Sequence, residues 1–190
     1  MPVGYTFELR VGSVDAVATE LRAPTLVGAE VAATCGFDLD EEVVDRWDEL
    51  AQDVARRTTS GSTWPGDGED EDAAMYVLAV VTTMTHWYGS LAHSSSGGEA
   101  FREFLEGPAD DALGGGLVHD LSGRELAGLL LDVLPSVGWA GNAELRAAVA
   151  RGLPDDCGHL GPEDEDDLVQ LIACVERAAA GGLDLFAVHD

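Results

Sequence analysis

The chain has 190 residues, and its 36 carboxylates outnumber its 10 basic side chains, which gives a formal net charge of −26. Every basic side chain is an arginine, and the absence of lysine excludes a Schiff-base nucleophile, a Walker-A loop and a kinase-type Lys–Glu pair. Because a strongly negative chain repels phosphate, we expect neither a nucleic acid nor an anionic membrane surface as a partner.

The first part of the chain is predicted to form a strand followed by helices. Apolar and polar residues alternate over residues 5–11, which is typical of a half-buried strand. Ser13 is the predicted N-cap of a short helix that ends at Leu21, before Pro24. Apolar side chains recur at intervals of three and four over residues 40–57, which predicts one amphipathic helix followed by a polar loop.

An apolar segment occupies the middle of the chain, and we expect one central helix over residues 71–91. Residues 73–92 carry no formal charge, but they include several polar side chains and have no basic flanks. This pattern favours a buried core helix over a membrane span.

Two capping boxes predict helices in the second half of the chain. Residues 96–99 read Ser-Gly-Gly-Glu and open a helix that is expected to stop at Pro108. Residues 122–125 read Ser-Gly-Arg-Glu and open a second helix, which Pro135 is expected to end.

The last part of the chain is predicted to contain two helices and a strand. Asn142 is the expected cap of a shorter helix, and residues 163–180 form the last helix. Residues 183–188, Leu-Asp-Leu-Phe-Ala-Val, are predicted to form a strand, and pairing with residues 5–11 would close a small sheet with helices packed on it. The predicted fold class is therefore α+β and mostly helical, as a single globular domain over residues 1–190.

The compartment is inferred from the N-terminus and the cysteines. The first residues have neither a basic region nor an apolar core, so we expect no signal peptide. Cys35, Cys157 and Cys174 are odd in number and show no C-x-x-C spacing. Free thiols in a cytoplasmic protein are the simplest interpretation, and we expect no cofactor and no metal.

The acidity has three interpretations. It can serve solubility in a high-GC genome, it can form a surface for a basic partner or mimic a nucleic acid, or it can reflect a salt-adapted proteome. The acidic runs 38–42, 67–72 and 163–167 lie at predicted helix starts, where carboxylates favour the helix dipole by about 0.3–1 kcal/mol each. Alternatively, residues 67–72 and 155–167 form one acidic face, since no arginine occurs between Arg57 and Arg102 or between Arg151 and Arg177.

The histidines suggest a second kind of site. His86 and His93 are seven residues apart and would share one face of the expected central helix. His119, beside Asp120, would complete an acid–base or metal site. A rise of about 10.5 Å separates residues seven apart on a helix, which is too far for both to ligate one ion unless the helix ends between them. A structural role at the edge of the core is the competing interpretation.

Other motifs support no specific chemistry. Cys157 and His159 place a thiol near an imidazole, but pairs so close in sequence rarely have catalytic geometry. The serines at 94–96 precede a predicted helix start that could bind an anion, and the capping box already explains them. Residues 67–72 have a calcium-like composition without the glycine and glutamate of an EF-hand loop.

Two segments carry a family resemblance. They are residues 94–101, Ser-Ser-Ser-Gly-Gly-Glu-Ala-Phe, which follow the His-Trp-Tyr of residues 86–88, and residues 176–186, Glu-Arg-Ala-Ala-Ala-Gly-Gly-Leu-Asp-Leu-Phe. In these segments the chain resembles small actinobacterial domains of unknown function. The resemblance implies an α+β fold and a bacterial cytoplasmic setting, and it transfers no catalytic residue.

The function predicted from the sequence is that of a non-enzymatic, acidic protein that binds a basic protein partner, as an immunity protein or an antitoxin does. An exposed tryptophan in the acidic loop would add an anchor. The predicted partner-binding residues are Trp64, Asp67, Glu69, Asp70, Glu71, Asp72, Asp155, Asp156, Glu163 and Asp164. The alternative is a small enzyme or a ligand- or metal-binding protein that uses His86, His93, His119 and Asp120.

Overall fold

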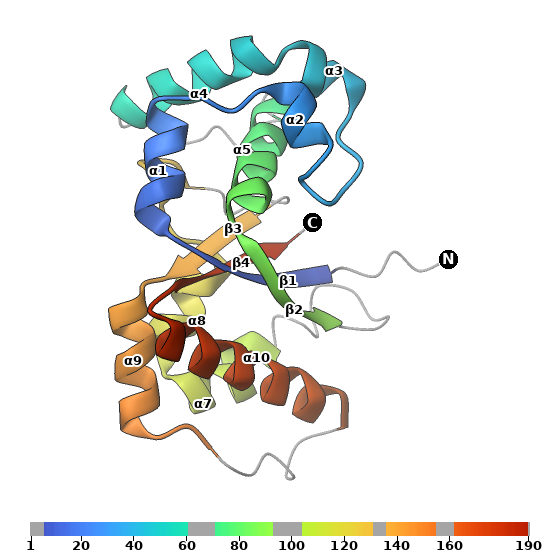
Figure 1. Cartoon of the computed structure of the whole chain (residues 1–190). Helices are drawn as coiled ribbons and strands as arrows, with labels where there is room; N and C mark the ends of the chain where they lie inside the picture. The colour runs from blue at the N-terminus through green and yellow to red at the C-terminus, as the bar shows by residue number, and fades with distance from the viewer. Residues whose placement is uncertain (1–5, 61–70, 93–103, 131–135, 155–161, 190) are drawn as a thin grey trace.

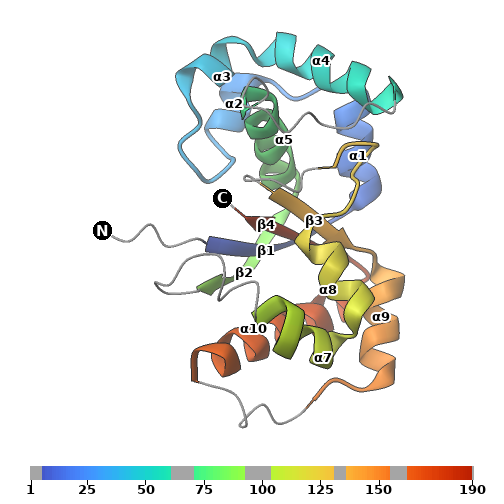
Figure 2. The ribbon, with the colours of Figure 1, turned by 180° about the vertical axis from the view of Figure 1, so that it is seen from behind.

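A computed structural model describes residues 6–60, 71–92, 104–130, 136–154 and 162–189. Within these residues, one four-stranded sheet lies between two groups of helices (Figures 1 and 2). The fold is α+β and mostly helical, as predicted.

The sheet is antiparallel throughout, and its strands lie in the order β2-β1-β4-β3. The strands are β1 (Thr6–Gly12), β2 (His86–Ala92), β3 (Ser136–Ala140) and β4 (Asp184–His189). The N- and C-terminal strands pair along the centre of the sheet, with Leu9 opposite Ala187. The predicted pairing of the two end strands is therefore confirmed.

The first group of helices is called the upper layer, because Figure 1 draws it above the sheet. Its helices are α1 (Val14–Arg22), α2 (Gly28–Ala32), α3 (Glu41–Asp45), α4 (Trp47–Ser60) and α5 (Glu71–Met84). The second group, the lower layer, covers the opposite face. It consists of η2 (Leu105–Ala109, a π-helix), α7 (Asp110–Leu113), α8 (Gly115–Ser122), α9 (Asn142–Arg151) and α10 (Pro162–Gly181).

Each face of the sheet contributes to its own hydrophobic core. On β1, Leu9 and its neighbours two residues away point into the lower core, beside the buried face of α10. On β4, Phe186 and Val188 point into the upper core and pack with helices α1 to α5. Successive residues of β4 therefore face two different apolar cores, whereas the other face of β1 carries the polar residues Glu8 and Arg10.

Local signals explain the elements that were predicted correctly. The Ser13 hydroxyl accepts a hydrogen bond from the Ala16 N–H at 3.2 Å and caps α1. The last helix buries Leu168, Leu171 and Val175, which are spaced by three and four residues.

The prediction of one helix over residues 71–91 was wrong. Helix α5 ends at Met84, and residues 86–92 form strand β2. From residue 73 onward both parts are uncharged and largely apolar in sequence, so the spacing of apolar residues could not separate them. The contacts that end the helix come from β1, far away in the sequence.

Two other predicted helices also differ from the structure. The helix expected over residues 40–57 is divided at Arg46 into α3 and α4. The helix expected to stop at Pro108 instead contains this proline within η2. Proline lacks an N–H, and the wider π turn accommodates this missing donor. The capping box at residues 96–99 lies outside the described residues.

The capping box at Ser122 was wrong as well. Ser122 is the last residue of α8, and a tight turn follows in which Leu126 and Leu129 exchange two backbone hydrogen bonds. Ala127 and Gly128 form this turn with φ of 56° and 87°, values that a right-handed helix does not permit. Strand β3 was not predicted, because its five residues give too short a pattern.

Asn142 begins α9, as expected, but its side chain does not cap that helix. The side-chain amide donates to carbonyls at the end of α10, at 3.1 Å to Ala178 and 3.1 Å to Leu183. The N-terminus of α9 is closed instead by Glu144, which accepts from the Gly141 N–H at 2.7 Å.

Candidate interaction surface

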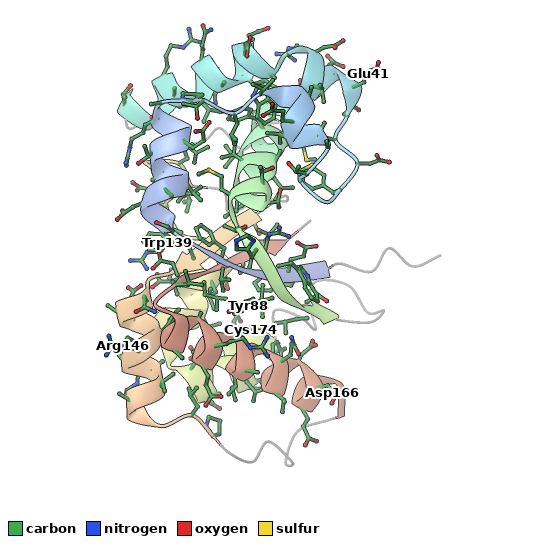
Figure 3. The ribbon with its side chains drawn as sticks, viewed as in Figure 1. Glu41, Tyr88, Trp139, Arg146, Asp166 and Cys174 are labelled. Atoms are coloured by element: carbon green, nitrogen blue, oxygen red, sulfur yellow. The ribbon has the colours of Figure 1, made fainter. Side chains whose placement is uncertain are left out.

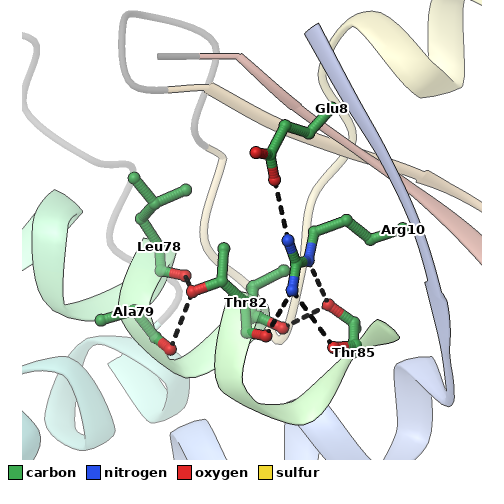
Figure 4. A network of polar contacts seen from close by, with 7 residues as sticks. Glu8, Arg10, Leu78, Ala79, Thr82 and Thr85 are labelled. Atoms are coloured by element: carbon green, nitrogen blue, oxygen red, sulfur yellow. Dashed lines mark hydrogen bonds and ion pairs between the residues drawn. The ribbon is translucent and has the colours of Figure 1, made fainter. Parts of the chain in front are cut away.

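The buried side chain of Arg10 lies where helix α5 ends and strand β2, which begins with His86, starts. Arg10 on β1 is 9% exposed and donates to the carbonyl oxygens of Thr82, at 2.8 Å, and Thr85, at 3.3 Å (Figure 4). Its Nε also donates to Thr85 Oγ1 at 3.0 Å, and Glu8 balances the charge at 2.8 Å. The guanidinium thus caps the C-terminus of α5 and turns the chain into β2.

The predicted histidine site is divided between the two edges of the sheet. His86 is the first residue of edge strand β2, whereas His119 and Asp120 lie on α8, which packs on the opposite edge strand, β3. With strands about 4.8 Å apart, the two edges are separated by about 14 Å. The structure therefore does not bring His86 and His119 together, and His93 lies outside the described residues.

Carboxylates gather at the outer end of the upper layer, where α3, the start of α4 and the start of α5 meet. The upper acidic surface consists of Asp38, Asp40, Glu41, Glu42, Asp45, Asp48, Glu49, Glu71 and Asp72. Arg46 lies within it and forms ion pairs with Asp72, with Glu49 at 3.6 Å and with Glu42 at 3.9 Å. The hydrogen bond and the charge of Glu49 raise the pKa of Arg46 above its ordinary value.

The upper acidic surface contains two of the predicted partner-binding residues, Glu71 and Asp72. Asp72 is engaged by Arg46, so it also holds α5 against the α3–α4 junction. The remaining carboxylates of this surface were not chosen as partner-binding residues from the sequence. The sequence signal that could have identified them is the recurrence of acidic residues at helical spacing after residue 38.

A second group of carboxylates lies in the lower layer, in the first turns of α10. The α10 acidic cluster consists of Asp164, Glu165 and Asp166. Among the described residues, no arginine forms an ion pair with any of the three. Figure 3 shows Asp166 and Glu41 at opposite ends of the molecule, so the sheet separates the two acidic regions.

The other predicted partner-binding residues cannot be placed. Trp64, Asp67, Glu69, Asp70, Asp155 and Asp156 lie outside the described residues, and Glu163 is placed only as part of α10.

Most arginines bind groups of the chain itself. In the described part of the chain, six of them contact carboxylates or carbonyl oxygens: Arg10, Arg46, Arg56, Arg57, Arg124 and Arg151. Arg177 lies 5.3 Å over the ring of Tyr88. Because the cations are used internally, the negative potential of the surface carboxylates is left largely uncompensated.

The described residues offer little for metal or thiol chemistry. Among them, no group of three His, Cys, Asp or Glu side chains is arranged to hold a metal ion. Cys35 and Cys174 are free and buried, and burial raises the pKa of the Cys174 thiol. Cys157 and His159 lie outside the described residues.

An exposed aromatic residue on β2 was not identified from the sequence. Trp87 is 57% exposed, whereas Trp47 is buried and Trp139 half-buried. The sequence placed Trp87 inside a core helix, and only its position on an edge strand reveals its exposure.

Comparisons with known proteins place the chain in no family: no family model, curated protein or solved structure matches it. Within the described residues, none of the helices combines the length and the apolarity of a membrane span.

Proposed function

We propose that this chain is a non-enzymatic, acidic interaction protein that binds a basic protein partner, in the manner of an immunity protein or an antitoxin. The observation that carries the proposal is the internal use of the arginines beside two clusters of surface carboxylates. Such a surface attracts a cationic partner and accelerates association, most strongly at low ionic strength.

The α10 acidic cluster is the better supported contact region. Among the described residues its three carboxylates have no arginine partner, whereas the upper acidic surface surrounds Arg46. Binding to the α10 cluster therefore breaks no described ion pair. A cytoplasmic setting belongs to the same proposal, and the two buried free cysteines support it.

The alternative, an enzyme or ligand-binding site at His86, His93 and His119, has less support. His86 lies on edge strand β2, whereas His119 lies on α8, which packs on the opposite edge strand β3. A ligand that contacts both histidines would have to span the whole width of the sheet.

A pull-down from the lysate of the source organism, read by mass spectrometry at low and at moderate salt, tests the proposal. The baits are the native chain, a lower triple variant (Asp164→Asn, Glu165→Gln, Asp166→Asn) and an upper triple variant (Glu41→Gln, Asp45→Asn, Asp48→Asn). The two triples remove equal charge. The lower triple removes it from the first turns of α10, whereas the upper triple removes Glu41 and Asp48 from the first turns of α3 and α4 and Asp45 from the end of α3.

The expected result is a stoichiometric basic protein that is lost as salt rises and that the lower triple variant retains least. Equal retention by both variants would move the contact away from α10. Absence of any basic protein at either salt would contradict the proposed function, and metal analysis with a His86→Ala variant would then test the alternative.

A further inference from the structure

Among the described residues, strand β2 is an edge strand of the sheet. It pairs with β1 on one side, and no other described strand pairs with it on the other. Its residues include no lysine, arginine, proline or carboxylate, the side chains that commonly block an exposed edge. One irregularity is present, because Leu9 pairs with Gly89 and Arg10 with Trp87, which leaves Tyr88 as an extra residue. From Gly89 to Ala92 the register is regular.

The side chains at the start of this strand leave one aromatic ring exposed to solvent. Trp87 lies opposite Arg10, whose side chain points toward α5, so Trp87 lies on the upper face of the sheet. The buried Arg10 is already balanced by Glu8, and the indole remains 57% exposed. Tyr88 packs with the lower core, beside Cys174 (Figure 3). An exposed tryptophan is the side chain that best attracts a lysine or arginine cation.

Negative charge lies beside the far end of the same strand. Helix α10 packs under β2, with Arg177 over Tyr88 and Gln170 against Gly89. Figures 1 and 2 draw the start of α10, which carries the α10 acidic cluster, below the end of β2 at Leu91 and Ala92. This edge of β2 therefore runs from an aromatic ring toward a group of carboxylates.

Charge decides which occupant fits this edge. A second copy of the chain would bring two net charges of −26 together, which repulsion disfavours. An extended segment rich in lysine or arginine would instead satisfy the backbone groups of the edge and neutralise the nearby carboxylates.

We infer that the basic partner docks through an extended lysine- or arginine-rich segment, which adds as a strand to the edge of β2 that faces away from β1 and places a cation on Trp87. This inference rests on the proposed function and names the docking element for it. Backbone hydrogen bonds along residues 89–92 supply the pairing, and the α10 acidic cluster selects the charge.

The test is binding of three synthetic peptides to the full chain, measured by calorimetry at low salt. The first alternates lysine and threonine. The second has the same sequence with every backbone nitrogen methylated, which keeps every charge but removes the N–H donors from both edges of the peptide. The third alternates glutamate and threonine. The first peptide is also titrated into Trp87→Ala and into the lower triple variant.

The inference expects the lysine peptide to bind and the glutamate peptide not to bind. N-methylation and Trp87→Ala should each weaken binding by about tenfold. Because Trp87 is largely exposed, its substitution should leave the unfolding midpoint unchanged. Amide hydrogen exchange of residues 89–92 should slow when the lysine peptide is bound.

Two other results would overturn strand docking. If the methylated peptide and the Trp87→Ala variant bind as tightly as their parents while the lower triple variant binds less, the acidic surface attracts basic chains without strand addition, and the proposed function survives. If the lysine peptide does not bind at all, strand docking fails, and the pull-down decides separately on the proposed function.

Discussion

Asp184 accepts hydrogen bonds from two helices that lie on opposite faces of the sheet. Its carboxylate oxygens receive the Val14 N–H at the start of α1 and the Asn142 N–H at the start of α9, each at 2.8 Å. One side chain at the beginning of β4 therefore joins both layers to the central strands. A carboxylate at a helix N-terminus also meets the positive end of the helix dipole, and here it meets two.

Asp184→Ala is expected to lower the free energy of unfolding by about 2–4 kcal/mol, because two N–H groups lose a charged acceptor. Asp184→Asn keeps one carbonyl oxygen and should lose about half as much. Urea unfolding measures both, with Asp15→Ala as the control, since Asp15 is exposed in the first turn of α1. A loss for Asp184→Ala no larger than that for the control would mean that water replaces the carboxylate.

Glu144 should make stability depend on pH. It accepts hydrogen bonds at 2.7 Å from Arg124 and from the Gly141 N–H, and the bond from Arg124 is the main reason that its pKa lies below the ordinary 4.5. Because the unfolded chain has the higher pKa, it binds more protons as the solution is acidified. The stabilisation is thus complete above the unfolded pKa and is lost as the pH falls through the folded one.

Urea midpoints from about pH 6 down to pH 3 check this expectation. Glu144→Gln does not titrate, so its midpoint should fall less steeply below about pH 5 than that of the native chain. Glu30→Gln, at an exposed position, is the matched control and should follow the native curve. Parallel curves for all three proteins would show that Glu144 contributes nothing to the pH dependence.

At the scale of whole elements, contacts between neighbours in sequence were predictable and distant ones were not. The Ser13 cap and the alternation over residues 5–11 act within a few residues, and both predictions held. The end of α5 depends on Arg10, more than seventy positions earlier, so the sequence pattern continued the helix through β2. The same limit applies to the candidate site, because the acidic runs are visible in sequence while their separation into two layers is not.

Packing of α8 against β3 depends on the absence of a side chain at Gly138. A Cβ there would overlap the backbone carbonyls of Leu121 and Asp120, which cannot rotate away. Gly89 is also crowded, but the atom it would meet is the end of the flexible Gln170 side chain. Substitution by alanine should therefore lower the free energy of unfolding by different amounts at the two glycines.

Gly138→Ala is expected to lower the free energy of unfolding by about 3 kcal/mol or more, since α8 must move away from the sheet. Gly89→Ala should cost about 1 kcal/mol, since Gln170 can adopt another rotamer. Thermal and urea unfolding of the two variants measure the difference. Equal losses would mean that α8 adjusts as easily as a single side chain.

At the scale of the whole molecule, the net charge of −26 destabilises the folded state through repulsion between carboxylates. Another interaction must offset this repulsion. The internal arginine contacts neutralise individual carboxylates but leave the two acidic surfaces charged. A basic partner would neutralise these surfaces on binding. A salt-adapted chain would instead depend on a high concentration of ions in its surroundings.

The salt dependence of stability separates these two explanations. The screening length falls from about 30 Å at about 0.01 M salt to about 8 Å at about 0.15 M and only about 3 Å at 1 M. If the charge serves a partner, the melting temperature in sodium chloride should rise over the first interval, where self-repulsion is screened, and then level off. A continued rise of similar size between about 1 M and 3 M would contradict this expectation and favour salt adaptation. The upper and lower triple variants supply the control, because removing three carboxylates should reduce the early rise and leave the high-salt behaviour unchanged.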